Sequence, residues 1–266
     1  MRNKNLSILL ILTIQVILII SCAGHGTEAE PQTMMASPSP QGWAHIDLND
    51  LAEGSEIRAS GYRLMDQQPG LVRLTHGADS NDSVLVIAVH GYHSSGYEWV
   101  TGLKNLGLHY GSLFFFRYDW ERCPQDIAHD LTEVVKQVNA SKTYERIVIF
   151  GHSYGGVVVA QIASLLGNLN AEIHVIAAPL AGFAGLTDSC APLDYGSWSK
   201  AVRVIQHRTV KDQDGAFREL DMDPQEVDLP FYEIRTLPPT MDGHRLGHNW
   251  SVTWVLDQHV GKAHRL

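Results

Sequence analysis

The chain has 266 residues, of which 18% are charged and 44% hydrophobic, and its formal net charge is −9 at pH 7. An acidic chain with no local basic stripe lacks the Lys and Arg surface that displaces counterions from phosphates, which excludes nucleic acid as an expected partner. The length suits one α/β domain behind a short N-terminal leader, and no internal repeat divides it.

Residues 1–21 have the features of a signal peptide. Arg2 and Lys4 precede the apolar run Leu6 to Ile20, which is too short to span a bilayer comfortably. The sequence Ile-Ile-Ser-Cys that ends at Cys22 resembles a bacterial lipobox. This resemblance implies that Cys22 begins the mature chain and carries lipid, so that the protein is exported and anchored in a cell-envelope membrane, on its periplasmic or cell-surface side. The alternatives are an ordinary signal peptide with an incidental cysteine, and an uncleaved anchor.

Residues 22–42 are rich in Gly, Ser, Pro, Thr and Gln and show no hydrophobic period. Such a segment cannot bury enough apolar surface to offset its ordering entropy, so we expect a tether. Residues 43–266 then form the folded domain, which we expect to be a monomer.

The domain alternates apolar, β-branched runs with helical stretches. Such alternation predicts an α/β fold with a mostly parallel central sheet and helices on both faces. Two earlier runs, Trp43 to Leu48 and Leu71 to His76, are expected as antiparallel edge strands. The expected central strands are Ser83 to His90, Ser112 to Tyr118, Arg146 to Phe150, Ile173 to Ala177, Val202 to Gln206 and, last, Phe231 to Leu237; the expected helices are Gln125 to Val138 and Ser153 to Leu166.

Ser153 is the candidate nucleophile. It lies in Gly151-His152-Ser153-Tyr154-Gly155, directly after a predicted strand and directly before a predicted helix. A strand-to-helix turn this tight holds the serine in a strained backbone and needs flanking glycines, because a Cβ there would meet the neighbouring elements. In a loop, the same motif would indicate only a tight turn and not a nucleophile.

Together with His90-Gly91-Tyr92 after a central strand, this motif resembles the α/β-hydrolase superfamily, near its lipases and esterases. The resemblance covers nearly the whole mature domain. It implies that the backbone N–H groups of Tyr92 and Tyr154 bind an oxyanion, and that His90 and His152 are packed rather than catalytic.

The resemblance also implies the chain order serine, acid, histidine. For the acid we favour Asp214, because Gly215 permits a sharp turn and the following residues can anchor a helix; Asp212 is the alternative and Asp188 a third candidate. For the base we favour His248, just before an apolar segment that predicts a terminal helix, over His244.

Residues 178–199 are where such enzymes often insert a cap, and the short length here predicts a minimal one. The pattern leaves two alternatives for the large side chains of this stretch: they line an apolar acyl site, or they pack in the protein core. These side chains are Leu180, Phe183, Leu186 and Trp198. The two remaining cysteines are Cys123 and Cys190. Because an even number of cysteines in an oxidising compartment favours pairing, we expect a disulfide rather than two free thiols.

These residues predict a serine hydrolase that cleaves carboxylic esters of small molecules or lipids through an acyl-enzyme. A thioesterase, an amidase or an acyltransferase on the same scaffold is the alternative, as is an inactive lipoprotein that binds a partner. No nucleotide-binding glycine loop and no cluster at metal-ligand spacing occurs, so we expect neither a cofactor nor a metal.

Overall fold

The computed structural model describes residues 42–76, 83–182 and 189–263. The signal peptide, the lipidation site at Cys22 and all of the tether except its last residue lie outside these ranges. Within them, no helix is both long enough and apolar enough to cross a membrane.

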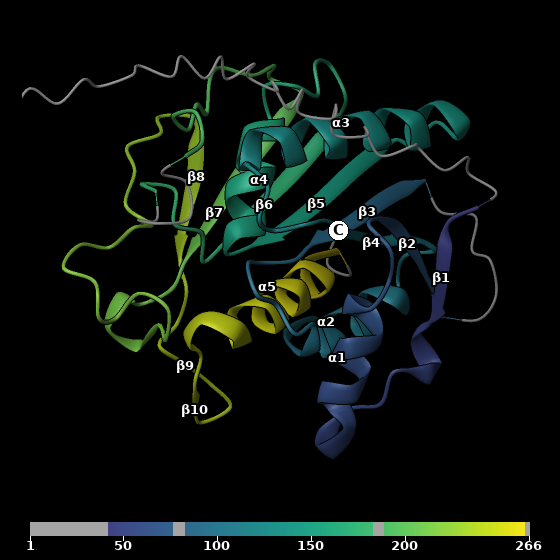
Figure 1. Cartoon of the computed structure of the whole chain (residues 1–266), viewed down its shortest axis with the longest axis horizontal. Helices are drawn as coiled ribbons and strands as arrows, with labels where there is room; N and C mark the ends of the chain where they lie inside the picture. The colour runs from purple at the N-terminus through teal and green to yellow at the C-terminus, as the bar shows by residue number, and fades with distance from the viewer. Residues whose placement is uncertain (1–41, 77–82, 183–188, 264–266) are drawn as a thin grey trace, which may run out of the picture. The chain divides into compact units, whose positions relative to one another are not determined.

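The described domain is a sheet between two layers of helices (Figure 1). Its strands are β1 (Ala44–Asp47), β2 (Gly70–Thr75), β3 (Val84–Val89), β4 (Ser112–Arg117), β5 (Arg146–His152), β6 (Ala171–Ile176), β7 (Val202–Arg208) and β8 (Tyr232–Thr236), with a small separate pair, β9 (Thr240–Met241) and β10 (His244–Arg245). Its helices are α1 (Ile57–Met65), α2 (Tyr97–Gly107), α3 (Pro124–Ser141), α4 (Tyr154–Ile162) and α5 (Gly247–Ala263), and three 3-10 turns are η1 (Leu48–Asp50), η2 (Gly54–Glu56) and η3 (Lys211–Gln213).

The sheet has eight strands in the order β1-β2-β4-β3-β5-β6-β7-β8, and the pairs from β4 to β8 are parallel. This confirms the predicted mostly parallel α/β fold. From β3 the chain moves to β4 on one side and then returns to β5 on the other. Such a switch point leaves a crevice beyond the carboxyl ends of its strands, where open α/β sheets bind ligands.

Both faces of the sheet are buried, which explains why the central strands are almost wholly apolar. Along β3, Leu85, Ile87 and Val89 pack in a core with α3 and α4, whereas Val86 and Ala88 pack in a second core with α2 and α5. Figure 1 shows the same division, with α1, α2 and α5 on one side of the sheet and α3 and α4 on the other.

The two N-terminal strands correct part of the sequence prediction. β2 runs antiparallel to β4 as expected, but β1 pairs with β2 in parallel, and β2 is not an edge strand because β1 covers it. The order of pairing depends on contacts between distant segments, which a local pattern does not encode. The helix expected after Ala216 and Phe217 is also absent, since residues 215–219 form turns.

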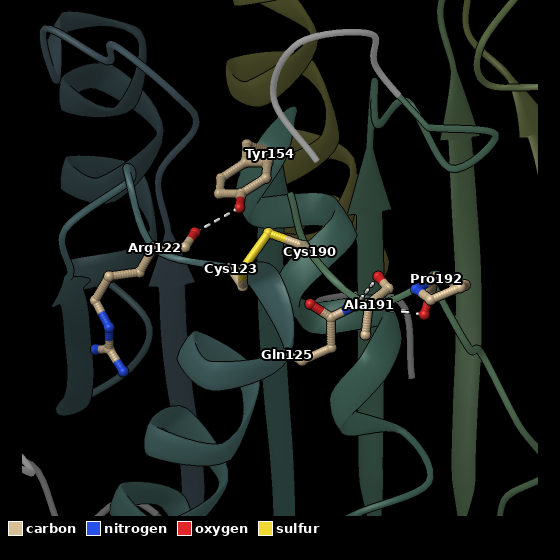
Figure 2. The surroundings of a disulfide bond; sticks show 7 residues. All are labelled: Arg122, Cys123, Gln125, Tyr154, Cys190, Ala191 and Pro192. Carbon is tan, nitrogen blue, oxygen red and sulfur yellow. Dashed lines mark hydrogen bonds between the residues drawn. A yellow bond between two sulfur atoms is a disulfide. The ribbon is translucent and has the colours of Figure 1, made fainter. Parts of the chain in front are cut away.

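The expected disulfide between Cys123 and Cys190 is present, with the two Cα atoms 5.6 Å apart. Cys123 caps α3, and Gln125 in the first turn of α3 donates from Nε2 to the carbonyl of Ala191, 2.7 Å away. The Tyr154 hydroxyl donates to the carbonyl of Arg122, next to Cys123, at 2.7 Å (Figure 2). The bridge therefore ties the segment before β7 to the start of α3, beside the residue that follows Ser153.

Replacing both Cys123 and Cys190 by serine should lower the free energy of unfolding by about 2–4 kcal/mol, because the bridge closes a loop of 67 residues in the unfolded chain. Urea unfolding followed by circular dichroism measures the loss. Reduction of the wild-type protein should reproduce it and should leave the double variant unchanged. Equal urea midpoints for wild type and variant would contradict the prediction.

Candidate active site

Ser153 lies at a strained turn between β5 and α4. Its φ and ψ angles are 54° and −120°, a region that residues with a Cβ rarely occupy. A Cβ at Gly155 would lie 2.2 Å from the carbonyl oxygen of His90, and one at Gly151 would lie 2.4 Å from the carbonyl oxygen of Gly155. The glycines of the motif therefore permit the close contact of β3, β5 and α4 that the sequence analysis predicts.

The segment after β3 passes directly beside Ser153. A Cβ at Gly91 would lie 2.9 Å from the Cβ of Ser153, so a side chain at position 91 would displace the serine. Gly91 and Tyr92 line the same cavity as Ser153, and the N–H of Tyr154 is one of the first N–H groups of α4, which lack acceptors within the helix. Both residues predicted to bind an oxyanion are thus next to the serine.

His90 is a packed residue, as expected. Its ring stacks on Tyr118, its Nδ1 lies 2.9 Å from the Gly91 carbonyl oxygen, and Arg117 approaches its Nε2 at 2.7 Å. Burial lowers the pKa of His90 to about 3, so its ring is neutral. Because the C=O and N–H of a trans peptide point in opposite directions, the hydrogen bond to the Gly91 carbonyl turns the Tyr92 N–H away from His90.

Asp214 and His248 form a hydrogen-bonded pair. Asp214 follows η3 in the segment after β7, and His248 is the second residue of α5. The His248 Nδ1 lies 3.0 Å from the Asp214 Oδ2, and the Asp214 side chain is fully buried. The structure therefore brings together the acid and the base that the sequence analysis favours.

The Asp214 carboxylate has further donors. The Ala216 N–H donates to its Oδ1 at 2.8 Å, and the Thr209 hydroxyl donates to its Oδ2 at 2.5 Å. Burial by itself would raise the pKa of Asp214, but the hydrogen bond and charge of His248, followed by these two donors, lower it below its usual value. The carboxyl group is thus ionised at neutral pH. Sequence reasoning missed Thr209, whose position directly after β7 carries no signal of this contact.

The alternative acid and base are both exposed on the surface. The Asp212 side chain is 90% exposed and its nearest ionic partner is Lys211, at 3.9 Å. His244 lies in the short strand β10 and is exposed. Asp188, the third candidate acid, lies outside the described residues.

His152 packs against His248 and hydrogen-bonds to its backbone. Its buried ring lies 4.6 Å from the His248 ring, centroid to centroid, and its Nε2 is 3.1 Å from the His248 carbonyl oxygen. Burial, and then the charge of His248, lower the pKa of His152 well below its usual value. A neutral ring donates to the carbonyl through Nε2 and fixes the first turn of α5 against the end of β5. This is the packed role that the resemblance predicts for His152.

Two neighbouring cavities meet at His248. The smaller has a volume of about 290 Å³ and contains Ser153 and His248 in its wall, and the larger, of about 920 Å³, extends between α1, α2 and the start of α5. Both are lined by Arg58, Tyr97, Glu98, His248 and Asn249. The larger cavity thus opens beside the serine and histidine.

The cap residues pack differently from an acyl site. Leu180 is buried in the α3 and α4 core and Trp198 packs against that core, so neither lines the cavities at Ser153. The described parts of residues 178–199 contain no helix or strand, and Phe183 and Leu186 lie outside the description. The walls of the larger cavity come instead from α5, which the sequence predicts, and from α1 and α2, which it does not.

Glu98 is a second buried carboxyl group at the site, which sequence reasoning missed. It lies in the first turn of α2, only 7% exposed, and accepts a short hydrogen bond from the Ser94 hydroxyl. Burial raises the pKa of Glu98, and the Ser94 hydrogen bond and the charge of His248 offset this only in part.

Replacing Glu98 by glutamine should reduce the loss of folding stability that accompanies a rise in pH. Because the folded-state pKa is raised, the native state binds this proton more tightly than the unfolded chain, and stability falls as pH rises from the usual value to the folded one. The melting temperature of Glu98→Gln relative to wild type should therefore be higher at about pH 8 than at about pH 4. Glu226→Gln, on an exposed residue, is the control. A difference that stays constant with pH would contradict the prediction.

The model of the alpha/beta hydrolase family matches residues 86–255, which include Ser153, Asp214 and His248. The chain belongs to the alpha/beta hydrolase family. No curated relative matches this hydrolase.

Several solved structures are similar to this hydrolase. Est1E from Butyrivibrio proteoclasticus is 14% identical with a TM-score of 0.48, over 71% of this chain and 92% of the other. Carboxylesterase CesB (YbfK) from Bacillus subtilis is 12% identical with a TM-score of 0.46, over 77% and 95%. XC6422 from Xanthomonas campestris, described as an a/b serine hydrolase without lid, is 17% identical with a TM-score of 0.42, over 71% and 85%.

Proposed function

We propose that this hydrolase cleaves carboxylic esters with Ser153 as nucleophile, His248 as general base and Asp214 as the carboxylate that orients the histidine. The observation that carries the proposal is the hydrogen bond between Asp214 and His248, whose side chain lies in the same cavity wall as the strained Ser153. A serine hydroxyl becomes a good nucleophile only when a neighbouring imidazole takes its proton.

The contacts of His248 suit a general base. Its Nδ1 donates to the ionised Asp214, which leaves Nε2 as the basic nitrogen and stabilises the imidazolium that forms when a proton arrives. Its backbone is held by His152, and the Ser251 hydroxyl donates to the same carbonyl. The ring is therefore oriented before a substrate binds.

The reaction proceeds in two halves. The Ser153 Oγ attacks the ester carbonyl carbon while its proton moves to the His248 Nε2, and the oxyanion accepts hydrogen bonds from the Tyr92 and Tyr154 N–H groups. The imidazolium then protonates the departing alcohol, which leaves an acyl group on Ser153. Water attacks this acyl-enzyme with His248 again as base, and the acid product and free serine are released.

The larger cavity is the proposed binding site for the rest of the ester. Tyr97 and Trp250 supply aromatic surface, and the Arg58 guanidinium lies 5.2 Å from the centre of the Tyr97 ring. Trp250 is 53% exposed, so a bound acyl or alcohol chain would cover apolar surface that is now in contact with water. A wall of this composition suits a medium-sized ester with an apolar part.

The test is labelling with a fluorophosphonate and hydrolysis of a series of p-nitrophenyl esters from short to long acyl chains. We expect the wild-type protein to be labelled and active, and Ser153→Ala to be neither. A folded wild-type protein that is unlabelled would contradict the serine nucleophile and favour a binding role. Labelling without ester hydrolysis would contradict the ester assignment and direct the search to thioesters, amides and acyl transfer.

We further propose that the hydrolase is exported and anchored through lipid on Cys22. The disulfide between Cys123 and Cys190 supports an oxidising compartment. Growth with a radiolabelled fatty acid should label the wild-type protein in the membrane fraction, and Cys22→Ser should be unlabelled. Equal labelling, or no label in either protein, would contradict the anchor.

A further inference from the structure

A second cluster of ionisable side chains lies on the α5 face of the sheet. Glu172 and His174 are on β6 and point to the same face, and His259 is on α5. In the sheet register Glu172 is opposite Val148 and His174 is opposite Phe150, so the cluster lies before the end of β5 that carries Ser153. It is separate from the proposed active site, which does not use these residues.

The three side chains converge. One ligand atom from each lies within 4.8 Å of the other two. The Glu172 Oε1 is 2.8 Å from the His174 Nε2 and 3.7 Å from the His259 Nδ1. Two ligands of a tetrahedral zinc ion lie roughly 3.3–3.5 Å apart, given zinc–nitrogen and zinc–oxygen bonds of about 2.0–2.2 Å. The separations of 2.8 Å and 3.7 Å from the Glu172 oxygen lie on either side of this spacing.

Each of the three side chains also has a partner on its other polar atom. The His207 Nε2 lies 3.0 Å from the His174 Nδ1, the Tyr110 hydroxyl lies 3.0 Å from the His259 Nε2, and the Arg203 Nη1 donates to the Glu172 Oε2 at 2.9 Å. Metal-bound histidines typically use the second ring nitrogen in this way, because the outer hydrogen bond fixes the tautomer and the orientation of the ring. The remaining atoms, His174 Nε2, His259 Nδ1 and Glu172 Oε1, are those that converge.

The space around the cluster favours metal binding, whereas the nearby arginine charges disfavour it. A cavity of about 380 Å³ reaches all three residues and offers room for water ligands. Arg146, Arg203 and Arg235 line the same cavity, and their positive charge disfavours a cation. Glu233 pairs with both Arg203 and Arg235, which reduces that charge. Two imidazoles and one carboxylate in contact are a donor set for a metal and not for an anion, since the carboxylate would repel an anion.

We propose that Glu172, His174 and His259 bind a divalent transition-metal ion, with Zn²⁺ as the best fit to two imidazoles and one carboxylate. Water from the cavity completes the coordination. The ion would connect β6 to the last turns of α5, whose first turn carries His248. Its role is therefore to stabilise α5, and it takes no part in the ester chemistry.

The test uses purified protein treated with EDTA and dialysed into phosphate-free buffer. Calorimetric titration with Zn²⁺ should show one bound ion per chain, and at 100-fold excess over the dissociation constant Zn²⁺ should raise the melting temperature by roughly 5–10 °C. His174→Gln and His259→Gln should each abolish both effects. His129→Gln, on an exposed histidine of α3, should retain both, which controls for stray binding by the 14 histidines of the chain.

A variant outside the ligands guards against misfolding of the ligand variants. Tyr110→Phe removes only the hydroxyl that contacts the His259 Nε2, and it should weaken Zn²⁺ binding by about 10- to 100-fold. The proposal is wrong if Zn²⁺ binds equally to wild type, His259→Gln and Tyr110→Phe, or binds to none of them. It is also wrong if inorganic phosphate raises the melting temperature and Zn²⁺ does not, since the cavity is then an anion site.

Discussion

Replacing Ser153 or His248 by alanine should each lower kcat by about a millionfold, and the double variant should lose no more than either single one. The two side chains act in one step, since the hydroxyl is activated only while the imidazole accepts its proton. Removing either group therefore removes the same stabilisation of the transition state. The measurement is hydrolysis of the best p-nitrophenyl ester by each variant, with circular dichroism to verify the fold.

His244→Ala is the matched control for His248→Ala. It removes an exposed histidine only four positions away, from β10, and should keep nearly full activity. If His244→Ala loses as much activity as Ser153→Ala while His248→Ala remains active, the base is misassigned and β10 must move to the serine when substrate binds.

Replacing Asp214 by asparagine should lower kcat by about ten-thousandfold, the size of effect known when the carboxylate of such a triad becomes an amide. The amide keeps the shape of the side chain but loses the charge that stabilises the imidazolium. It also presents an N–H group that favours the wrong tautomer of His248. The measurement is kcat from ester hydrolysis, at a pH where the wild-type rate is constant.

Asp212→Asn controls for the charge of the loop. Because the Asp212 side chain is 90% exposed, its replacement should leave the fold intact, as surface substitutions usually do, and this variant should retain wild-type kcat within about twofold. Equal losses in Asp212→Asn and Asp214→Asn would show that the net charge of the segment matters, rather than the contact with His248.

The sequence predicted the Ser153 turn because all its parts are contiguous. The strand, the glycines and the helix follow one another within residues 146–162, so local pattern and local geometry coincide. Asp214 and Asp212 are only two positions apart, and their side chains differ in direction because of the η3 turn and the buried Thr209 hydroxyl. A sequence pattern places both aspartates in one loop, and only the folded chain shows which is buried.

Tertiary contacts explain the elements that were missed. α1 and α2 contain Gly61 and Gly102, which weaken helix propensity, and packing against their neighbours stabilises them. Glu98 on α2 was missed with its helix. The cluster of Glu172, His174 and His259 was missed because strand β6 and helix α5 are far apart in the chain.

The backbone of Ser153 has a consequence for the evolution of this protein. At φ 54° and ψ −120°, glycine is more favourable than serine, and residues held in such regions cost about 1–3 kcal/mol. Selection for thermostability alone would therefore favour glycine at position 153 and remove the hydroxyl on which the proposed chemistry depends. Under the proposed function, serine at this position lowers stability in exchange for activity, as is common where a reacting residue adopts a strained backbone conformation.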